Sequence, residues 1–126
     1  MTRNVTSKLL DLRLQAYPKA IEITDSINRE KGGHLDPEKM KIALLELNKW
    51  RTGMVRLIIS SQSQILLFDL RDALKKKPSN AESYSLEQVD RIWKLRNLLR
   101  QSLRDDVGVL HFEDSNDRKN LRSKSA

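Results

Sequence analysis

Hydrophobic residues in the first quarter of the chain recur at helical spacing. Steps of three and four residues separate the members of one apolar stripe: Val5, Leu9, Leu12, Ala16, Ala20, Ile23 and Ile27. This spacing keeps side chains on one face of an α-helix. The pattern predicts a helix over 6–29, closed by Gly32 and Gly33 and kinked at Pro18, because proline lacks an N–H and its ring clashes with the preceding turn.

A second helix is predicted over 36–52. Asp36, Pro37 and Glu38 supply an N-cap side chain, a first-turn proline and an acid at the positive end of the helix dipole. The expected core face holds Met40, Ala43, Leu44, Leu47 and Trp50. Ile42 and Leu45 lie on the other side of this helix, so we expect that side to contact a second element.

The middle of the chain combines a β-prone run with a helix start. We expect residues 54–59, "MVRLII", to form an extended connector. Ser61 and Gln64 have the spacing of a capping box, which predicts a helix over 61–76. The apolar run here is too short and too polar for a membrane span of about 20 residues.

A fourth helix is predicted over 85–106, with Ser85 and Gln88 as a capping box and Gly108 as its stop. Residues 107–112 are also β-prone, and a minor pairing of 54–59 with 107–112 is possible. The sequence therefore predicts a single all-α domain over 1–112 with four main helices. Residues 113–126 are polar and lack periodicity, and we expect a disordered tail.

Composition agrees with a helical protein and excludes several kinds of site. Only 5% of the residues are aromatic and 38% are hydrophobic, which disfavours a β-sandwich or a β-barrel. The absence of cysteine excludes a disulfide framework, a thiolate zinc site and a cysteine nucleophile. The charged first residues do not fit a signal peptide, so we expect a cytoplasmic protein.

Two arginines fall on apolar faces of predicted helices. Arg96 projects among Val89, Ile92, Leu99 and Leu103, and Arg13 lies among Leu9, Tyr17 and Ala20. A buried guanidinium must be paired, because an unpaired buried charge costs several kcal/mol. Asp69 is the first candidate partner and Asp72 the second. A structural ion pair, or a side chain that reaches water, is favoured over an anion-binding cleft.

Basic residues suggest a second kind of binding. The chain carries a net charge of +7, Arg96, Arg100 and Arg104 recur every four residues, and Lys75, Lys76 and Lys77 form a run. This pattern could bind nucleic acid or an anionic surface. Three acids, Asp90, Asp105 and Asp106, dilute it, and no aromatic residue interleaves for base stacking. A solvated face is the favoured interpretation.

No catalytic motif, metal-ligand set or cofactor motif is recognisable in the chain. His34 and His111 have no second histidine at ligand spacing, and neither a glycine-rich phosphate loop nor a nucleophile elbow occurs. We therefore expect a protein without enzymatic activity. The leading hypothesis is an interaction domain that binds another protein, or itself, through an apolar face.

Three segments carry a resemblance to a loose group of bacterial helical proteins without an assigned activity. These are "LRLQAYPKAIEIT", "KWRTGMVRLIISSQSQILLFDLRDAL" and "KLRNLLRQSLRDDVG", in order over about 5–110. The resemblance implies that recurrent positions of the group are occupied here by Arg13, Tyr17, Pro18, Arg96, Asp105 and Gly108. Some members carry a membrane segment before the helical part, and this chain departs from that pattern.

Overall fold

Five helices make up the part of the chain that the structure, a computed structural model, describes: residues 2–80 and 82–108, with side chains from Ser7 onward. The helices are α1 (Thr2–Asp25), α2 (Pro37–Trp50), α3 (Val55–Ile58), α4 (Ser61–Lys75) and α5 (Leu86–Asp106). No strand occurs among these residues. The predicted all-α class and the four main helices are confirmed.

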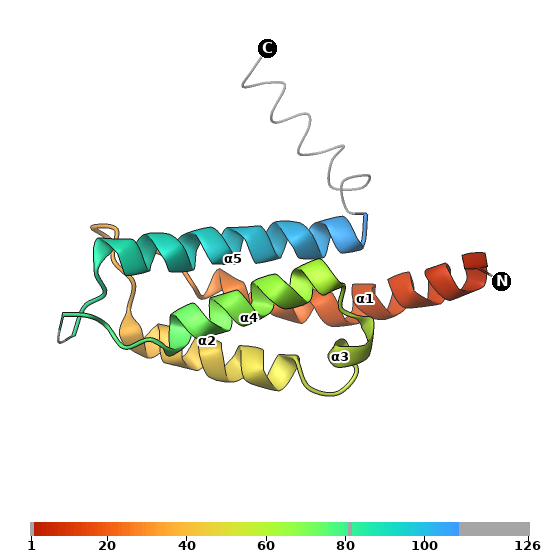
Figure 1. Cartoon of the computed structure of the whole chain (residues 1–126), viewed down its shortest axis with the longest axis horizontal. Helices are drawn as coiled ribbons and strands as arrows, with labels where there is room; N and C mark the ends of the chain where they lie inside the picture. The colour runs from red at the N-terminus through yellow and green to blue at the C-terminus, as the bar shows by residue number, and fades with distance from the viewer. Residues whose placement is uncertain (1, 81, 109–126) are drawn as a thin grey trace, which may run out of the picture.

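The four long helices form a bundle in which each contacts two others. The contacting pairs are α1 with α2, α2 with α4, α4 with α5, and α5 with α1. Successive long helices run in opposite directions, and the N-terminal part of α1 extends beyond the rest of the bundle (Figure 1). This is the up-down-up-down arrangement that short connections between antiparallel neighbours favour.

The core is built from the C-terminal part of the first predicted apolar stripe and from the predicted core face of α2. The contact expected for Ile42 and Leu45 is wrong, because these side chains are 53% and 61% exposed. Tyr17 and Trp50 meet edge to face, with ring centroids 6.1 Å apart. The Nε1–H of Trp50 donates a hydrogen bond of 2.8 Å to the carbonyl oxygen of Ala16. The largest fully buried apolar side chains are Ile27, Leu35, Met40, Leu47, Leu67, Leu70, Ile92, Leu99 and Leu103.

Local signals set most helix boundaries as predicted. The Asp36 side chain accepts from the Glu38 N–H at the start of α2, and Ser85 and Gln88 form the complete capping box of α5. Gly108 follows α5 with φ +66° and donates its N–H to the Asp105 carbonyl. Glycine suits this left-handed position because it lacks a Cβ.

Helix α1 is displaced from its predicted span of 6–29. It continues through Pro18 without a loop and ends at Asp25. Side chains of Ser26 and Asn28 hydrogen-bond the carbonyls of Ile23 and Asp25, and such local bonds compete with further helical turns. Gly32 and Gly33 therefore do not end the helix but lie in the loop that follows it.

The connector expected over 54–59 is wrong, because residues Val55–Ile58 form the short helix α3. Val55 and Ile58 are buried, so packing outweighs the β-preference of these residues. The minor pairing expected between 54–59 and 107–112 is therefore not formed, because the first segment is helical. In the second segment, residues 109–112 lie outside the described residues.

The start of α4 also differs by one residue from the expected cap. Ser60 is the N-cap, and its Oγ accepts from the Ser63 N–H, in place of the box between Ser61 and Gln64. The predicted tail, 113–126, lies outside the described residues. None of the helices in the described ranges is long and apolar enough to cross a membrane.

Candidate functional site

Arg13, one of the two anomalous arginines, bridges the ends of two helices. Its Nε donates to the Ile58 carbonyl at 2.7 Å, and its Nη1 donates to the Asp106 carbonyl at 3.3 Å. These oxygens belong to the last residues of α3 and α5, where carbonyls have no partner within their own helix. The half-buried guanidinium is thus held by backbone oxygens.

Arg96 and Arg100 of α5 bind the C-terminal end of α1 in the same manner. Arg96 Nε donates to the Thr24 carbonyl at 3.1 Å. Arg100 Nη1 lies 3.0 Å from the Ile21 carbonyl and 2.8 Å from a carboxylate oxygen of Asp25. A cation at a helix C-terminus is favourable because the helix dipole is negative there.

The expected partners of Arg96 are wrong. Asp69 and Asp72 form no ion pair with it among the described residues; its hydrogen bonds go to Thr24 and Asn97, and its guanidinium lies 4.5 Å from the Trp93 ring centroid. The helical projection placed Arg96 on the correct face of α5, but that face meets α1 at Arg96 and not the aspartates of α4. The carbonyls of α1 supply the acceptors that a carboxylate was expected to supply.

The basic residues proposed for anion binding do not gather into one surface. Arg96 and Arg100 turn towards α1, and Lys75, Lys76 and Lys77 are exposed at the C-terminal end of α4. Arg104 lines an apolar groove of about 270 Å³ between α1 and α5. The ends of α4 and α5 where the lysines and Arg104 lie are opposite ends of the bundle (Figure 1).

Asp106 is the centre of a polar cluster that sequence reasoning did not find. Its Oδ2 accepts hydrogen bonds from Tyr17 at 2.9 Å, Ser60 at 2.8 Å and Ser63 at 2.7 Å. Ser63 also contacts Ser102 through their hydroxyls, at 2.7 Å. The cluster therefore ties α1, α4 and α5 together at one end of the bundle.

Because it is buried, this cluster holds the helices together, and its serine hydroxyls are poorly placed to act as nucleophiles. The Ser63 side chain is fully buried, so no substrate could reach its hydroxyl without opening the bundle. Burial and the neighbouring Asp106 carboxylate raise the pKa of Tyr17, because both oppose the phenolate. The Tyr17 hydroxyl thus remains a hydrogen-bond donor at ordinary pH.

A second arginine cluster lies between α2 and α4, and its guanidinium groups donate no hydrogen bond to a helix-terminal carbonyl among the described residues. The guanidinium carbons of Arg51 and Arg71 each lie 5.6 Å from the ring centroid of Phe68. Arg71 Nε donates to the amide oxygen of Asn48. Burial and the charge of Arg51 lower the pKa of Arg71, although Asp72 opposes this shift.

The Nε of Arg51 is buried and has no hydrogen-bond partner among the described residues. Beside it lies a crevice of about 20 Å³, lined also by Val55, Arg56, Gln64 and Phe68. Phe68 and Arg71 stand three residues apart in the sequence, which is the only hint of this cluster before folding. The contribution of Arg51 depends on how α2 packs against α4.

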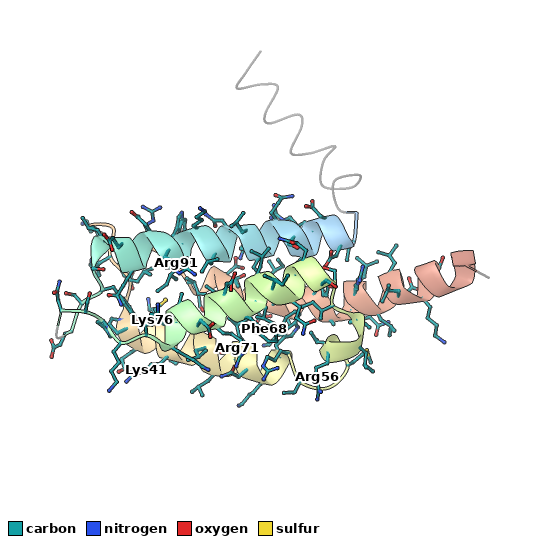
Figure 2. All side chains as sticks on the ribbon, in the orientation of Figure 1. Lys41, Arg56, Phe68, Arg71, Lys76 and Arg91 are labelled. Atoms are coloured by element: carbon teal, nitrogen blue, oxygen red, sulfur yellow. The ribbon has the colours of Figure 1, made fainter. Side chains whose placement is uncertain are left out.

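The helices that carry this second cluster also carry exposed apolar side chains. Five exposed apolar side chains of α2, α3, α4 and the connection before α3 are Leu45 (61%), Met54 (51%), Leu57 (85%), Ile65 (55%) and Phe68 (36%); Ile42 of α2 is exposed as well (53%). We call these five residues the apolar face. Figure 2 shows Phe68 and Arg71 on α4 facing the viewer, with Arg56 near α3 and Lys41 near α2. Each of the three helices that contribute to the apolar face thus also carries a cation.

Comparison of the chain with protein-family models, curated proteins and solved structures found no match. The resemblance to the bacterial helical group stays a prediction. Within the described ranges, no three histidine, aspartate or glutamate side chains are grouped to hold a metal ion. The site is thus defined by its own geometry: an apolar face with two arginines against one of its members, Phe68.

Proposed function

We propose that this protein is a non-enzymatic interaction domain that binds another protein through the apolar face. The observation that carries the proposal is the exposure of five large apolar side chains on neighbouring elements, with Leu57 85% exposed. Exposed apolar residues that occur singly are common, but a contiguous patch with a polar border is typical of binding surfaces.

Packing explains why the face is left open. Leu67 and Leu70 already fill the buried side of α4, so Ile65 and Phe68 are surplus to the bundle. On α3, Val55 and Ile58 point inward and Leu57 points outward. Covering these side chains would remove apolar area from water, at about 25 cal/mol per Å².

The test is site-specific photo-crosslinking in the native host cell. A photoreactive phenylalanine analogue replaces Leu57 in one variant and Leu86 in a control. Leu86 is 80% exposed at the start of α5, at the other end of the bundle from α3 (Figure 1). We expect a discrete adduct at 57 and none at 86.

Equal adducts at 57 and 86, or none at 57, would contradict the proposal. Light scattering after size exclusion then separates the two kinds of partner. A dimer of the purified chain that Leu57→Ser dissociates identifies a second copy, and a monomer assigns the adduct to a different protein.

A second candidate, binding of nucleic acid or of an anionic surface, is supported by the net charge and by the exposure of Lys75, Lys76 and Lys77. It is weakened because Arg96 and Arg100 are engaged with α1. Its test is binding to generic DNA at two salt concentrations, since phosphate contacts give a steep salt dependence. No binding at low salt would exclude it.

A further inference from the structure

We infer that Arg51 and Arg71 receive a carboxylate from the partner, so that the occupant of the apolar face is an acidic amphipathic helix. This inference rests on the proposed function and adds the chemistry of the partner. It uses the arginine pair next to Phe68, the Arg51 Nε–H that has no acceptor among the described residues, and the size of the crevice lined by Arg51.

Neither cation belongs to an ion pair of the described residues. Asp72 follows Arg71 directly, but no ion pair joins either arginine to a carboxylate among the described residues. The buried Nε of Arg51 donates to nothing there. A buried donor without an acceptor destabilises the fold, because it has lost its hydrogen bond to water. An anion at this point would satisfy the donor and separate the two like charges.

The crevice selects a small oxygen group. Its volume of about 20 Å³ corresponds to roughly one water molecule. One carboxylate oxygen fits there against Arg51, and the second would lie outside the crevice, where it can meet Arg71, which does not line the crevice itself. Guanidinium and carboxylate groups match in this paired geometry, and such bonds are stronger than those between neutral groups.

The surroundings favour a protein helix over nucleic acid. Phe68 already contacts two guanidinium groups, which compete with a base for its ring. The nearby exposed side chains, Leu57 and Ile65, are apolar. An amphipathic helix supplies both requirements at once, with apolar residues on one stripe and carboxylates beside it.

Charge also argues against a second copy of this chain as the occupant. A two-fold contact places the same patch of both copies face to face. A two-fold axis through the crevice would bring Arg51 and the exposed Arg56 of one copy towards the same cations of the other. Like charges across an interface are strongly unfavourable, so a partner with carboxylates fits this face better.

The experiment measures fluorescence anisotropy of two labelled amphipathic peptides. Both have leucine at every third or fourth position, and the flanking positions are glutamate in one and glutamine in the other. The proteins are the wild type, the double variant Arg51→Gln/Arg71→Gln, and the charge-matched control Arg91→Gln/Lys94→Gln. Both control positions are exposed on α5.

We expect the glutamate peptide to bind the wild type and the control with equal affinity, and the double variant at least about tenfold more weakly. The glutamine peptide should bind the wild type about as weakly as the double variant binds the glutamate peptide. The NMR resonance of the Arg51 Nε–H should shift with the glutamate peptide alone.

Equal affinity of the wild type for both peptides, or an equal loss in the control, would overturn the inference. Tighter binding of single-stranded DNA or of phosphatidylglycerol vesicles, lost in the double variant, would overturn it in favour of a phosphate. Absence of binding by either peptide also overturns it. The crosslink at position 57 decides the proposed function independently, because it requires no particular charge on the partner.

Discussion

Two clusters in this bundle each combine one aromatic ring with two arginines, and they differ in the hydrogen-bond acceptors that the arginines reach. On the α1–α5 side, Arg29 and Arg96 flank Trp93 at 4.7 and 4.5 Å. On the α2–α4 side, Arg51 and Arg71 flank Phe68 at 5.6 Å. In each, two guanidinium groups lie near one ring, yet among the described residues only on the α1–α5 side do arginines donate to backbone carbonyls of another helix.

The difference lies in what each cluster meets. Arg96 and the adjacent Arg100 reach the last turn of α1, whose carbonyls need donors. The α2–α4 cluster meets one amide oxygen, that of Asn48, and leaves a donor of Arg51 unused. A cluster of arginines is therefore no sign of a binding site until its acceptors have been counted.

The largest expected loss of stability comes from removing an arginine whose hydrogen bonds hold the end of α1. Arg100→Met should lower the free energy of unfolding by about 2 kcal/mol, because the Ile21 carbonyl and the Asp25 carboxylate lose their donor. Most of this cost belongs to the carbonyl, since Asp25 is 61% exposed and exposed ion pairs contribute little. Urea unfolding measures the change.

Tyr17→Phe tests the hydrogen bond between α1 and α5 through the pH dependence of the free energy of unfolding. Loss of the hydrogen bond to Asp106 should cost about 1 kcal/mol near neutral pH. Folding raises the pKa of Tyr17, so its contribution is complete below about pH 10, the usual value for tyrosine, and is lost as pH rises above it. The wild type should thus lose its advantage over the variant in alkaline solution.

A parallel pH profile for the two proteins would show that Tyr17 does not carry this dependence. The remaining tyrosine, Tyr84, and the lysines are common to both proteins, so their titration cancels in the difference.

Arg71→Met is the matched change on the open side. We expect its free energy of unfolding to stay within about 0.5 kcal/mol of the wild type, because the lost bond to Asn48 is offset by relief of repulsion from Arg51. The measurement is the same urea titration as for Arg100→Met. Equal losses in the two variants would remove the distinction between the clusters.

Salt should produce the smallest effect. Raising sodium chloride from about 0.05 M to about 0.5 M screens the repulsion between Arg51 and Arg71. We expect the wild type to gain a few tenths of a kcal/mol relative to Arg71→Met, and Arg91→Met to respond like the wild type. Differential scanning calorimetry detects this as a shift of Tm, and identical shifts in all three proteins would contradict it.

The sequence was sufficient for the long helices and for most of their ends. Apolar residues at helical spacing and local caps such as Asp36 and Ser85 act within a few residues, so they can be recognised without a fold. It was insufficient for α3, since a four-residue helix has little periodicity and depends on the burial of Val55 and Ile58.

The site was less predictable for a related reason. Arg13 and Arg96 stood out correctly as cations on apolar faces, but their acceptors are backbone carbonyls, which every residue carries and no sequence pattern marks. The pair formed by Arg51 and Arg71 combines two helices, and neither residue is unusual in its own helix. Only the packing of α2 against α4 brings both guanidinium groups next to the Phe68 ring.

The joint at Asp106 has a consequence for synthesis of the chain. The hydroxyl of Tyr17 and the carboxylate of Asp106 are 89 residues apart in the sequence, and Arg13 is 93 residues from the carbonyl that it binds there. During translation, α1 emerges first but obtains these partners only after α5 has left the ribosome. A chain halted before residue 106 would leave its first helix loosely held, with its apolar stripe open to chaperones and proteases.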